Sequence, residues 1–279
     1  MGDIKIVFSD IDGTFLNGDS QVNPRTGLAA RALAAKMPFV LVSARMPEAI
    51  YPITEEIGIK IPIISYSGAL VLTEKEEILY DKRMEGTDTG MVLGVIQRDF
   101  PQVTLNYYAG RHWYVEGIDQ RVQREMDITQ AQAEVRDFEE ILLTEEMPNK
   151  ILVMAEPEDC ERMEKELSAQ FPSLHIVRSS AILLEIMDKS VSKAAGIEVM
   201  LQHFGLKAED SLAFGDNYND VEMLKYCGRS VAMGNAPEDI KALASAVTLS
   251  NEEDGLAEYL EKNGLIDAAV KPLPLGMGI

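Results

Sequence analysis

Two carboxylates stand at the end of the first apolar run of the chain. The run covers residues 4–8, and Asp10 and Asp12 follow it, with Gly13 and Thr14 directly behind them. A continuous apolar run is typical of a strand that is buried on both faces of a parallel sheet. In an extended backbone, residues two apart point to the same side, so both acids can face one site. Acids placed together repel each other, which indicates a bound cation or a reaction that uses them.

Two further apolar runs also end in polar residues. Residues 39–42 lead into Ser43, and residues 211–214 lead into Asp216. The carboxyl ends of parallel strands meet at one edge of a sheet, where open α/β folds bind their ligands. The three acids, the Ser43 hydroxyl and Lys193 can therefore converge there. Oxygen ligands without histidine or cysteine suit Mg²⁺, and this set of groups fits phosphoryl transfer better than hydrolysis of carbon–nitrogen bonds.

These strand ends belong to an alternation of strands and helices, which predicts an α/β fold with a central parallel sheet. Strands of this sheet are expected at 4–8, 39–42, 61–66, 211–214 and 230–233. Between about residues 86 and 188 the pattern becomes mixed, which predicts an inserted α+β segment with its own small core. Its expected helices include 118–128 and 135–143. We also expect a small hairpin at Asn17-Gly18, beside the three acids.

The composition is that of an ordinary globular protein of 279 residues, with 46% hydrophobic residues and a formal net charge of −20. The negative charge argues against nucleic acid or an anionic membrane as the main partner. Cys160 and Cys227 form no C-x-x-C pair, and reduced thiols are expected. No apolar run is long enough to span a bilayer, and the N-terminal residues do not resemble a signal peptide. These features favour a cytoplasmic protein, as a monomer or a homodimer.

Four motifs, taken in order, resemble those of the haloacid dehalogenase superfamily of phosphatases. They are Asp10-Ile11-Asp12-Gly13-Thr14, Ser43 after its strand, Lys193, and Gly215-Asp216-Asn217-Tyr218-Asn219-Asp220. The position of the insert and the form of the fourth motif are similar to the Cof-type, sugar-phosphatase-like branch. That resemblance implies a Rossmann-like core, residues 1–84 and 189–279, and an α/β cap of type II, residues 85–188, which would determine substrate specificity.

The resemblance also implies roles for single residues. Asp10 would be the nucleophile that forms an aspartyl-phosphate, and Asp12 the general acid and base. Mg²⁺ would bind the carboxylates of Asp10 and Asp216 and the backbone carbonyl of Asp12. Asp220 would support the metal through a water molecule or orient Lys193. Five residues would bind the phosphoryl group or the substrate, through a polar side chain or a backbone amide. They are Thr14, Ser43, Ala44, Lys193 and Asn219.

The activity that this implies is Mg²⁺-dependent hydrolysis of small phosphorylated metabolites such as sugar phosphates. A phosphomutase of the same superfamily and a non-catalytic phosphoacceptor remain alternatives, because both use similar groups. Two positions depart from the family pattern. Ser43-Ala44-Arg45 replaces Thr-Gly-Arg but keeps the hydroxyl, and Ser67 stands where the family commonly has asparagine. The hairpin aromatics Tyr107, Tyr108, Trp113 and Tyr114 would either fill the core of the insert or contact substrate.

Overall fold

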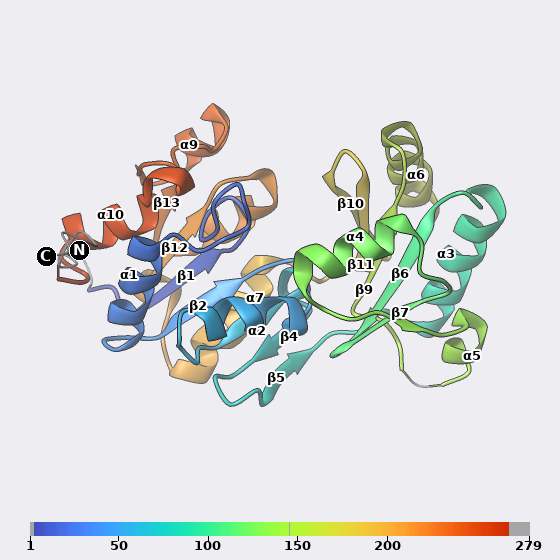
Figure 1. Ribbon diagram of the computed structural model, residues 1–279, viewed down its shortest axis with the longest axis horizontal. Coiled ribbons are helices and arrows are strands. Elements are labelled where there is room, and N and C mark those ends of the chain that lie inside the picture. Colours follow the sequence, from blue (N-terminus) through green and yellow to red (C-terminus); the bar gives the residue numbers. More distant parts are fainter. Residues whose placement is uncertain (1–2, 145, 268–279) are drawn as a thin grey trace, which may run out of the picture.

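The computed structural model describes residues 3–144 and 146–267, which form two lobes (Figure 1). One lobe, which we call the core, is built on an eight-stranded sheet, and the other, the insert, is built on a six-stranded sheet. The expected α/β architecture with an inserted α+β segment is confirmed. No helix within these described ranges has the length and apolar character needed to cross a membrane.

The core sheet has the strand order β14-β13-β12-β1-β2-β3-β4-β5. Strands β14 to β3 are parallel neighbours, and β4 and β5 extend that edge in antiparallel pairing. Strand β1 is central, as its continuous apolar run predicts. The strands are β1 (Ile6–Asp10), β2 (Phe39–Val42), β3 (Ile63–Ser65), β4 (Leu70–Leu72), β5 (Ile78–Asp81), β12 (Ser211–Gly215), β13 (Arg229–Ala232) and β14 (Ala246–Val247).

Helices cover both faces of the core sheet. The first face is packed by α1 (Pro24–Ala34), α2 (Pro47–Glu56) and α10 (Gly255–Lys262). The second face is packed by α7 (Lys193–Phe204), α8 (Val221–Tyr226) and α9 (Glu238–Leu243). Alternate residues of β1 enter the two layers: Val7 packs with the first set of helices, and Ile6 and Phe8 pack with the second. This two-sided burial fixes the direction in which each strand end points.

The insert sheet has the order β10-β11-β9-β6-β7-β8, and all its pairs except β7–β8 are antiparallel. Helices α3, α5 and α6 pack on one face, while α4 lies on the other face, toward the core. The elements are α3 (Gly86–Asp99), β6 (Thr104–Ala109), β7 (His112–Val115), α4 (Gln120–Thr129), β8 (Glu134–Val135), α5 (Phe138–Leu142), β9 (Lys150–Met154), α6 (Pro157–Gln170), β10 (Leu174–Ser180) and β11 (Leu183–Asp188).

Strand alternation separates the four hairpin aromatics. Tyr107 and Tyr114 pack into the interior of the insert, beneath its outer helices. Tyr108 and Trp113 lie on the opposite face, which is turned toward the core, and their rings stack with centroids 5.5 Å apart. The hairpin therefore contributes one aromatic pair to the insert's own core and one to the surface that it shares with the core lobe.

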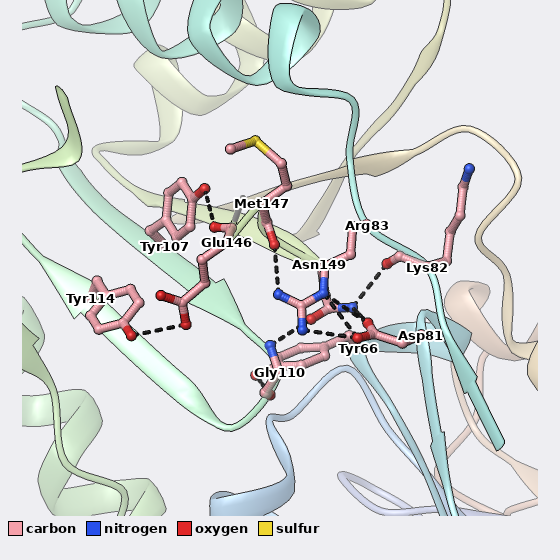
Figure 2. A network of polar contacts seen from close by, with 10 residues as sticks. All are labelled: Tyr66, Asp81, Lys82, Arg83, Tyr107, Gly110, Tyr114, Glu146, Met147 and Asn149. Carbon is pink, nitrogen blue, oxygen red and sulfur yellow. Dashed lines mark hydrogen bonds and ion pairs between the residues drawn. The ribbon is translucent and has the colours of Figure 1, made fainter. Parts of the chain in front are cut away.

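A polar network joins the lobes beside the chain crossing that follows β5 (Figure 2). Arg83 donates three hydrogen bonds to the Asp81 carboxylate at 2.9 to 3.0 Å and one to the Met147 carbonyl at 2.8 Å. Buried Asn149 donates to Asp81 and to the Lys82 carbonyl, at 2.6 and 2.9 Å. We use the name junction network for a set of eight residues between the lobes: Tyr66, Asp81, Lys82, Arg83, Gly110, Met147, Asn149 and Asp188.

The junction network also holds the β6–β7 turn. The Gly110 amide donates to the side-chain oxygen of Asn149 at 2.7 Å, and the Tyr66 hydroxyl of the core donates to the Gly110 carbonyl at 2.9 Å. The second chain crossing is tied to the first by an ion pair between Lys82 and Asp188, 3.2 Å apart. These bonds define how the insert sits on the core.

Two local predictions were wrong. The Asn17-Gly18 segment forms turns rather than a hairpin, because the Asn17 side-chain oxygen accepts the amides of Asp19 and Gln21 and so closes the loop without strand pairing. The expected helix at 135–143 is divided. Val135 pairs with β7, and the Asp137 side chain caps a helix that begins only at Phe138.

Candidate active site

The ends of β1 and β12 and the start of α7 bring three acids and one lysine together. Carboxylate oxygens of Asp10, Asp216 and Asp220 all lie within 4.8 Å of one another. The Lys193 ammonium lies 2.5 Å from Oδ1 of Asp10 and 2.6 Å from Oδ1 of Asp220. Lys193, Asp10 and Asp220 are all buried. We call these four residues the acidic cluster.

Strand register explains why residues so far apart in sequence meet here. In the parallel pairs, Asp10 lies opposite Val42 and Ser9 lies opposite Phe214, so Asp10, Ser43 and Asp216 follow neighbouring strand ends. This is the arrangement that the sequence predicts for these three residues.

Lys193 reaches the cluster because α7 begins there and packs closely on the sheet. The Ser192 hydroxyl caps the helix by accepting the Ala195 amide at 3.2 Å. A side chain at Gly196 would meet Ile64 at 2.6 Å, and one at Gly68 would meet the Ser192 carbonyl at 2.1 Å. The two glycines thus permit the close approach that buries the lysine.

Asp220 orients its neighbours. Its Oδ2 accepts the backbone amides of Asp216 and Asn217, at 2.9 and 3.1 Å, and its Oδ1 accepts from Lys193. Both oxygens are therefore engaged by protein donors. Of the two roles expected for Asp220, support of the metal through a water molecule or orientation of Lys193, the contact with Lys193 is present in this geometry.

Asp216 is held from the opposite side of the cluster. The Thr14 hydroxyl donates to its Oδ1 at 2.8 Å, and Asn235, which also donates to the Gly13 carbonyl, lies 3.4 Å from its Oδ2. Gly13 has φ +85°, and a Cβ at this position would lie 2.3 Å from the Asp216 carboxylate. Thr14 is expected to bind phosphate or substrate, but its hydroxyl donates to Asp216 instead. Two cavities lie between the core and the insert, and Thr14 is not among the described residues that line them.

The cluster carries more negative than positive charge. Burial, and next the charges of Asp220, Asp216 and Asp12, raise the pKa of Asp10, while Lys193 opposes the rise. Burial, together with Asp220, raises the pKa of Asp216 to about 6. Burial alone would lower the pKa of Lys193, but Asp10 and Asp220 raise it and keep the ammonium charged. Crowded carboxylate oxygens with a surplus of negative charge fit a hard divalent cation such as Mg²⁺.

Asp12 stands apart from this cluster. Its carboxylate accepts two hydrogen bonds from the Arg45 guanidinium, at 2.9 and 2.6 Å, and its side chain is 54% exposed. A fork of this kind holds the carboxylate in a defined orientation next to Asp10. Asp12 can therefore exchange protons with a group in the cavity, whereas Asp10 is enclosed.

Ser43 and Ala44 lie between the end of β2 and Arg45. The Ser43 oxygen accepts the Arg45 amide at 3.1 Å, which leaves the hydroxyl proton free to donate toward the cavity. Within the described part of the chain, the Ala44 amide has no hydrogen-bond acceptor. Both groups are thus available to a phosphoryl oxygen, as expected.

A cavity of about 280 Å³ lies between the core and the insert, above Asp10. The core contributes Asp12, Ser43, Ala44, Arg45 and Asn219, among others. Ser67 lines an adjoining cavity of about 400 Å³ together with Lys193, and its amide donates to the Ser43 carbonyl at 2.8 Å. Asp10, Asp12 and Ser43 line the first cavity and Lys193 the second, while Ala44 and Asn219 line both.

Sequence reasoning missed the residues that the insert places over Asp10. Lys150, Glu125 and Glu185 line the same cavity. A signal exists for two of them, since Lys150 directly precedes an apolar strand run and Glu185 interrupts one, and a charge at such a place faces either water or a partner. Arg45, the third residue of the Ser43-Ala44-Arg45 motif, has a specific partner in Asp12.

Comparisons with known proteins agree with this geometry. A family model described as haloacid dehalogenase-like hydrolase matches residues 7–260. A Haemophilus influenzae protein with a provisional phosphatase name is 36% identical over 260 residues, which cover 92% of this chain and 97% of that protein.

Solved structures give the same picture. A haloacid dehalogenase-like hydrolase from Bacteroides thetaiotaomicron superposes with a TM-score of 0.84 at 27% identity, covering 94% of this chain and 100% of its own. The structure of BT4131, described as a sugar phosphatase of subclass IIB, superposes with a TM-score of 0.81 at 26% identity and the same coverage.

Proposed function

Since this chain belongs to the haloacid dehalogenase-like hydrolase family and is a phosphatase, we propose that it hydrolyses phosphate monoesters of small metabolites, sugar phosphates in particular. The reaction uses Mg²⁺ and passes through a phosphorylated Asp10. The observation that carries the proposal is the placement of Asp10. One of its oxygens is fixed by Lys193, beneath a cavity that the Ser43 hydroxyl and Asp12 also line.

In the first half of the reaction, a carboxylate oxygen of Asp10 attacks the phosphorus atom, and the bond to the leaving oxygen breaks. Asp12 gives its proton to that oxygen, so the product leaves as an alcohol. Lys193, the Ser43 hydroxyl and the Ala44 amide bind the phosphoryl oxygens, and Asn219 contacts phosphate or substrate from the cavity wall. Arg45 holds the shuttle residue Asp12 within reach of the cavity.

In the second half, Asp12 accepts a proton from a water molecule that attacks the phosphorus atom of the acyl phosphate. The bond to Asp10 breaks, inorganic phosphate leaves, and both carboxylates return to their starting states. Asp12 thus donates a proton and then takes one back, which a half-exposed side chain beside the cavity can do.

Asp10, Asp216 and the backbone carbonyl of Asp12 would hold Mg²⁺, with Asp220 behind them. The ion would supply positive charge to the transferring phosphoryl group. The donor set supports this assignment, because it is made of oxygen atoms and carries uncompensated negative charge. Thr14 and Asn235 orient Asp216 from the other side.

We further propose that residues 85–188 act as a cap on a catalytic core of residues 1–84 and 189–279. The cavity between the lobes supports this, since its far wall is formed by the insert. The protein would work in the cytoplasm on small phosphorylated molecules, as a monomer or a homodimer. Cys160 and Cys227 are both free and buried, in keeping with a reducing compartment.

The test compares Asp10→Asn with Asp19→Asn, a matched change at an exposed acid in the turn nearby. Hydrolysis of an aryl phosphate and of sugar phosphates is followed as free phosphate, with Mg²⁺ and with a chelator. We expect Asp10→Asn to lose activity by about 10³-fold or more and Asp19→Asn to retain it. The chelator should abolish wild-type activity.

Wild-type turnover in Asp10→Asn would contradict the role of Asp10. Full activity with a chelator would contradict the metal. Recovery of an isomerised ester in place of free phosphate would identify a mutase.

A further inference from the structure

The wall that the insert presents to the 280 Å³ cavity carries its own pattern of charge. We propose that this wall is a charge filter, which restricts the enzyme to monoesters whose leaving group has no second anionic group. The inference rests on the proposed phosphatase function and concerns which phosphate esters the site accepts. Neutral polyhydroxylated leaving groups and amino sugars would pass, while bisphosphates and phosphorylated sugar acids would be rejected.

Lys150 is the cation of this wall, and its charge is already engaged. The side chain is buried, and Nζ donates to the Ala44 carbonyl at 2.6 Å. The Glu185 carboxylate lies 3.6 Å away, and the rings of Tyr108 and Tyr66 lie 5.2 and 5.8 Å from the ammonium. A second phosphate on the substrate would have to compete with all these partners for Lys150.

The other cation that lines this cavity, among the described residues, is Arg45. Its guanidinium is occupied by the two-fold hydrogen bond to Asp12. Each lysine or arginine among the described residues that line this cavity therefore already has a carboxylate or carbonyl partner, with which a second anion on the substrate would have to compete. Lys193 lies below, paired with Asp10 and Asp220 and directed at the phosphoryl position.

Two carboxylates complete the wall. Glu185 is buried beside Lys150, and Glu125 reaches the cavity from α4. Within the described residues, the Glu125 carboxylate has neither an ion pair nor a hydrogen bond. Burial raises the pKa of Glu125, while Lys150 and Arg45 act against that rise. The Glu125 carboxylate can therefore accept a hydrogen bond from the substrate, for example from a hydroxyl or an ammonium group of the leaving group.

The strands fix these groups toward the cavity. Lys150 pairs with Tyr108, and Glu185 pairs with Leu152. Because side chains alternate along a strand, Lys150, Leu152 and Glu185 share the face that Tyr108 and Trp113 also occupy. The wall thus combines an aromatic surface with acceptors, with Lys150 and Glu185 held by the sheet and Glu125 by α4.

The consequence is selection by repulsion. An anionic group here would face Glu125 and Glu185 in a half-buried space, where the described cations that line the cavity already have partners. Like charges brought together at an interface repel each other, which disfavours binding of such a substrate. A hydroxyl group instead donates to a carboxylate, and a protonated amine is attracted.

The experiment measures kcat/KM for matched pairs of substrates in the presence of Mg²⁺. The pairs are glucose 6-phosphate with 6-phosphogluconate, fructose 6-phosphate with fructose 1,6-bisphosphate, and glycerol 3-phosphate with 3-phosphoglycerate. Glucosamine 6-phosphate represents the cationic class, and an aryl phosphate reports the basal chemistry. We expect the member without a second anion to be preferred by at least about tenfold in each pair that is hydrolysed.

Variants assign the effect to the wall. Glu125→Gln, alone or combined with Glu185→Gln, should raise kcat/KM for the substrates that carry a second anionic group. The preference for the other member of each pair should then fall at least about threefold. Glu139→Gln, a matched change at an exposed position of α5, should leave it unchanged. Because Glu185 is buried, the single Glu125 variant keeps the test valid if the double variant fails to fold.

The outcomes separate the two proposals. If the wild type hydrolyses no phosphate ester, the aryl phosphate included, the proposed function fails and the filter fails with it. If the aryl phosphate is hydrolysed but the anionic members are used as well as the neutral ones, only the filter is overturned. An unchanged preference in a folded Glu125→Gln variant would also overturn it.

Discussion

The acidic cluster is largely buried and the junction network is buried only at Asn149 and Tyr66, and the two polar networks are built in opposite ways. In the cluster, three carboxylates share one ammonium, and burial and mutual repulsion raise the pKa values of Asp10 and Asp216. In the junction network, the Asp81 carboxylate meets the Arg83 guanidinium, and Asn149 uses both its donor and its acceptor (Figure 2).

The difference shows what each network contributes. A carboxylate whose pKa is raised in the folded state lowers stability at pH values above its unfolded pKa, so Asp10 and Asp216 oppose folding of the metal-free protein at neutral pH, while the raised pKa of Lys193 acts in the opposite direction. A satisfied buried network stabilises the one arrangement in which all its groups are paired. The properties of the cluster are those of a catalytic site. The junction network instead stabilises the position of the insert on the core, and with it the distance between the two walls of the cavity.

The largest effect is expected from the same substitution made in each network. Asp10→Asn should reduce kcat by about 10³-fold or more, and it should raise the unfolding temperature of the metal-free protein, because it removes a buried charge. Asp81→Asn should keep kcat within a few-fold and lower stability by about 1–3 kcal/mol, because Arg83 loses its charged partner.

Thermal unfolding in a chelator, together with kcat on an aryl phosphate, measures both. The contrast would break if Asp10→Asn unfolded at a lower temperature than Asp81→Asn.

Asn149→Ala should have the next largest effect, and on stability alone. The change leaves the Gly110 amide without its acceptor and removes donors from Asp81 and Lys82, at a cost of about 2–3 kcal/mol. Denaturant unfolding measures it, with Asn263→Ala at the exposed end of α10 as the matched control. A loss below that of the control would show that the junction network does not hold the lobes.

Mg²⁺ should stabilise the protein in a pH-dependent manner. The pKa of Asp216 is about 6 without metal, so its carboxylate is ionised above this pH and protonated below it. Binding requires the ionised form, so stabilisation should be present at pH 8 and lost as the pH falls through about 6. At ten times the dissociation constant it amounts to about 1.4 kcal/mol.

Thermal shifts with and without Mg²⁺ at pH 5 and pH 8 measure the effect, and Asp216→Asn should remove it at both. An equal shift at pH 5 and pH 8 in the wild type would argue against Asp216 as a ligand.

The smallest effect is expected at the exposed contact between the lobes. Arg111 of the β6–β7 turn pairs with Glu48 and Glu76 of the core, and its side chain is 50% exposed. Exposed pairs contribute little, so Arg111→Met should cost less than about 1 kcal/mol in denaturant unfolding. A loss of unfolding free energy as large as that of Asn149→Ala would show that this exposed contact, and not the junction network alone, holds the lobes together.

The sequence was sufficient for the core and for the acids. The apolar runs before Asp10, Ser43 and Asp216 are typical of strands buried on both faces of a parallel sheet. The carboxyl ends of parallel strands lie side by side at one edge of the sheet, which brings these three residues together. Lys193 was found by its motif, and the structure supplies the physical reason: Ser192 caps its helix, and Gly196 lets the helix lie close to β3.

The insert side of the site could not be predicted in the same way. Lys150 and Glu125 reach the cavity through the packing of one lobe on another, which leaves no periodic signal in the chain. Asn149 was equally hidden, since a buried side-chain amide with three partners looks like any loop asparagine in sequence. The Asn17-Gly18 prediction failed because a side-chain oxygen took the amides that a hairpin would have paired.

The most direct test of the central assignment, Asp10 as nucleophile and Asp12 as proton shuttle, is a trapping measurement with Asp12→Asn. An activated aryl phosphate needs no proton on its leaving oxygen, so Asp10 should still be phosphorylated, while the hydrolysis that needs Asp12 as a base is slowed. Borohydride reduction of the quenched enzyme, followed by peptide mass analysis, should then find homoserine at position 10 and nowhere else, dependent on Mg²⁺ and substrate. A reduced residue at another position, or continued turnover of Asp12→Asn at the wild-type rate, would contradict the assignment.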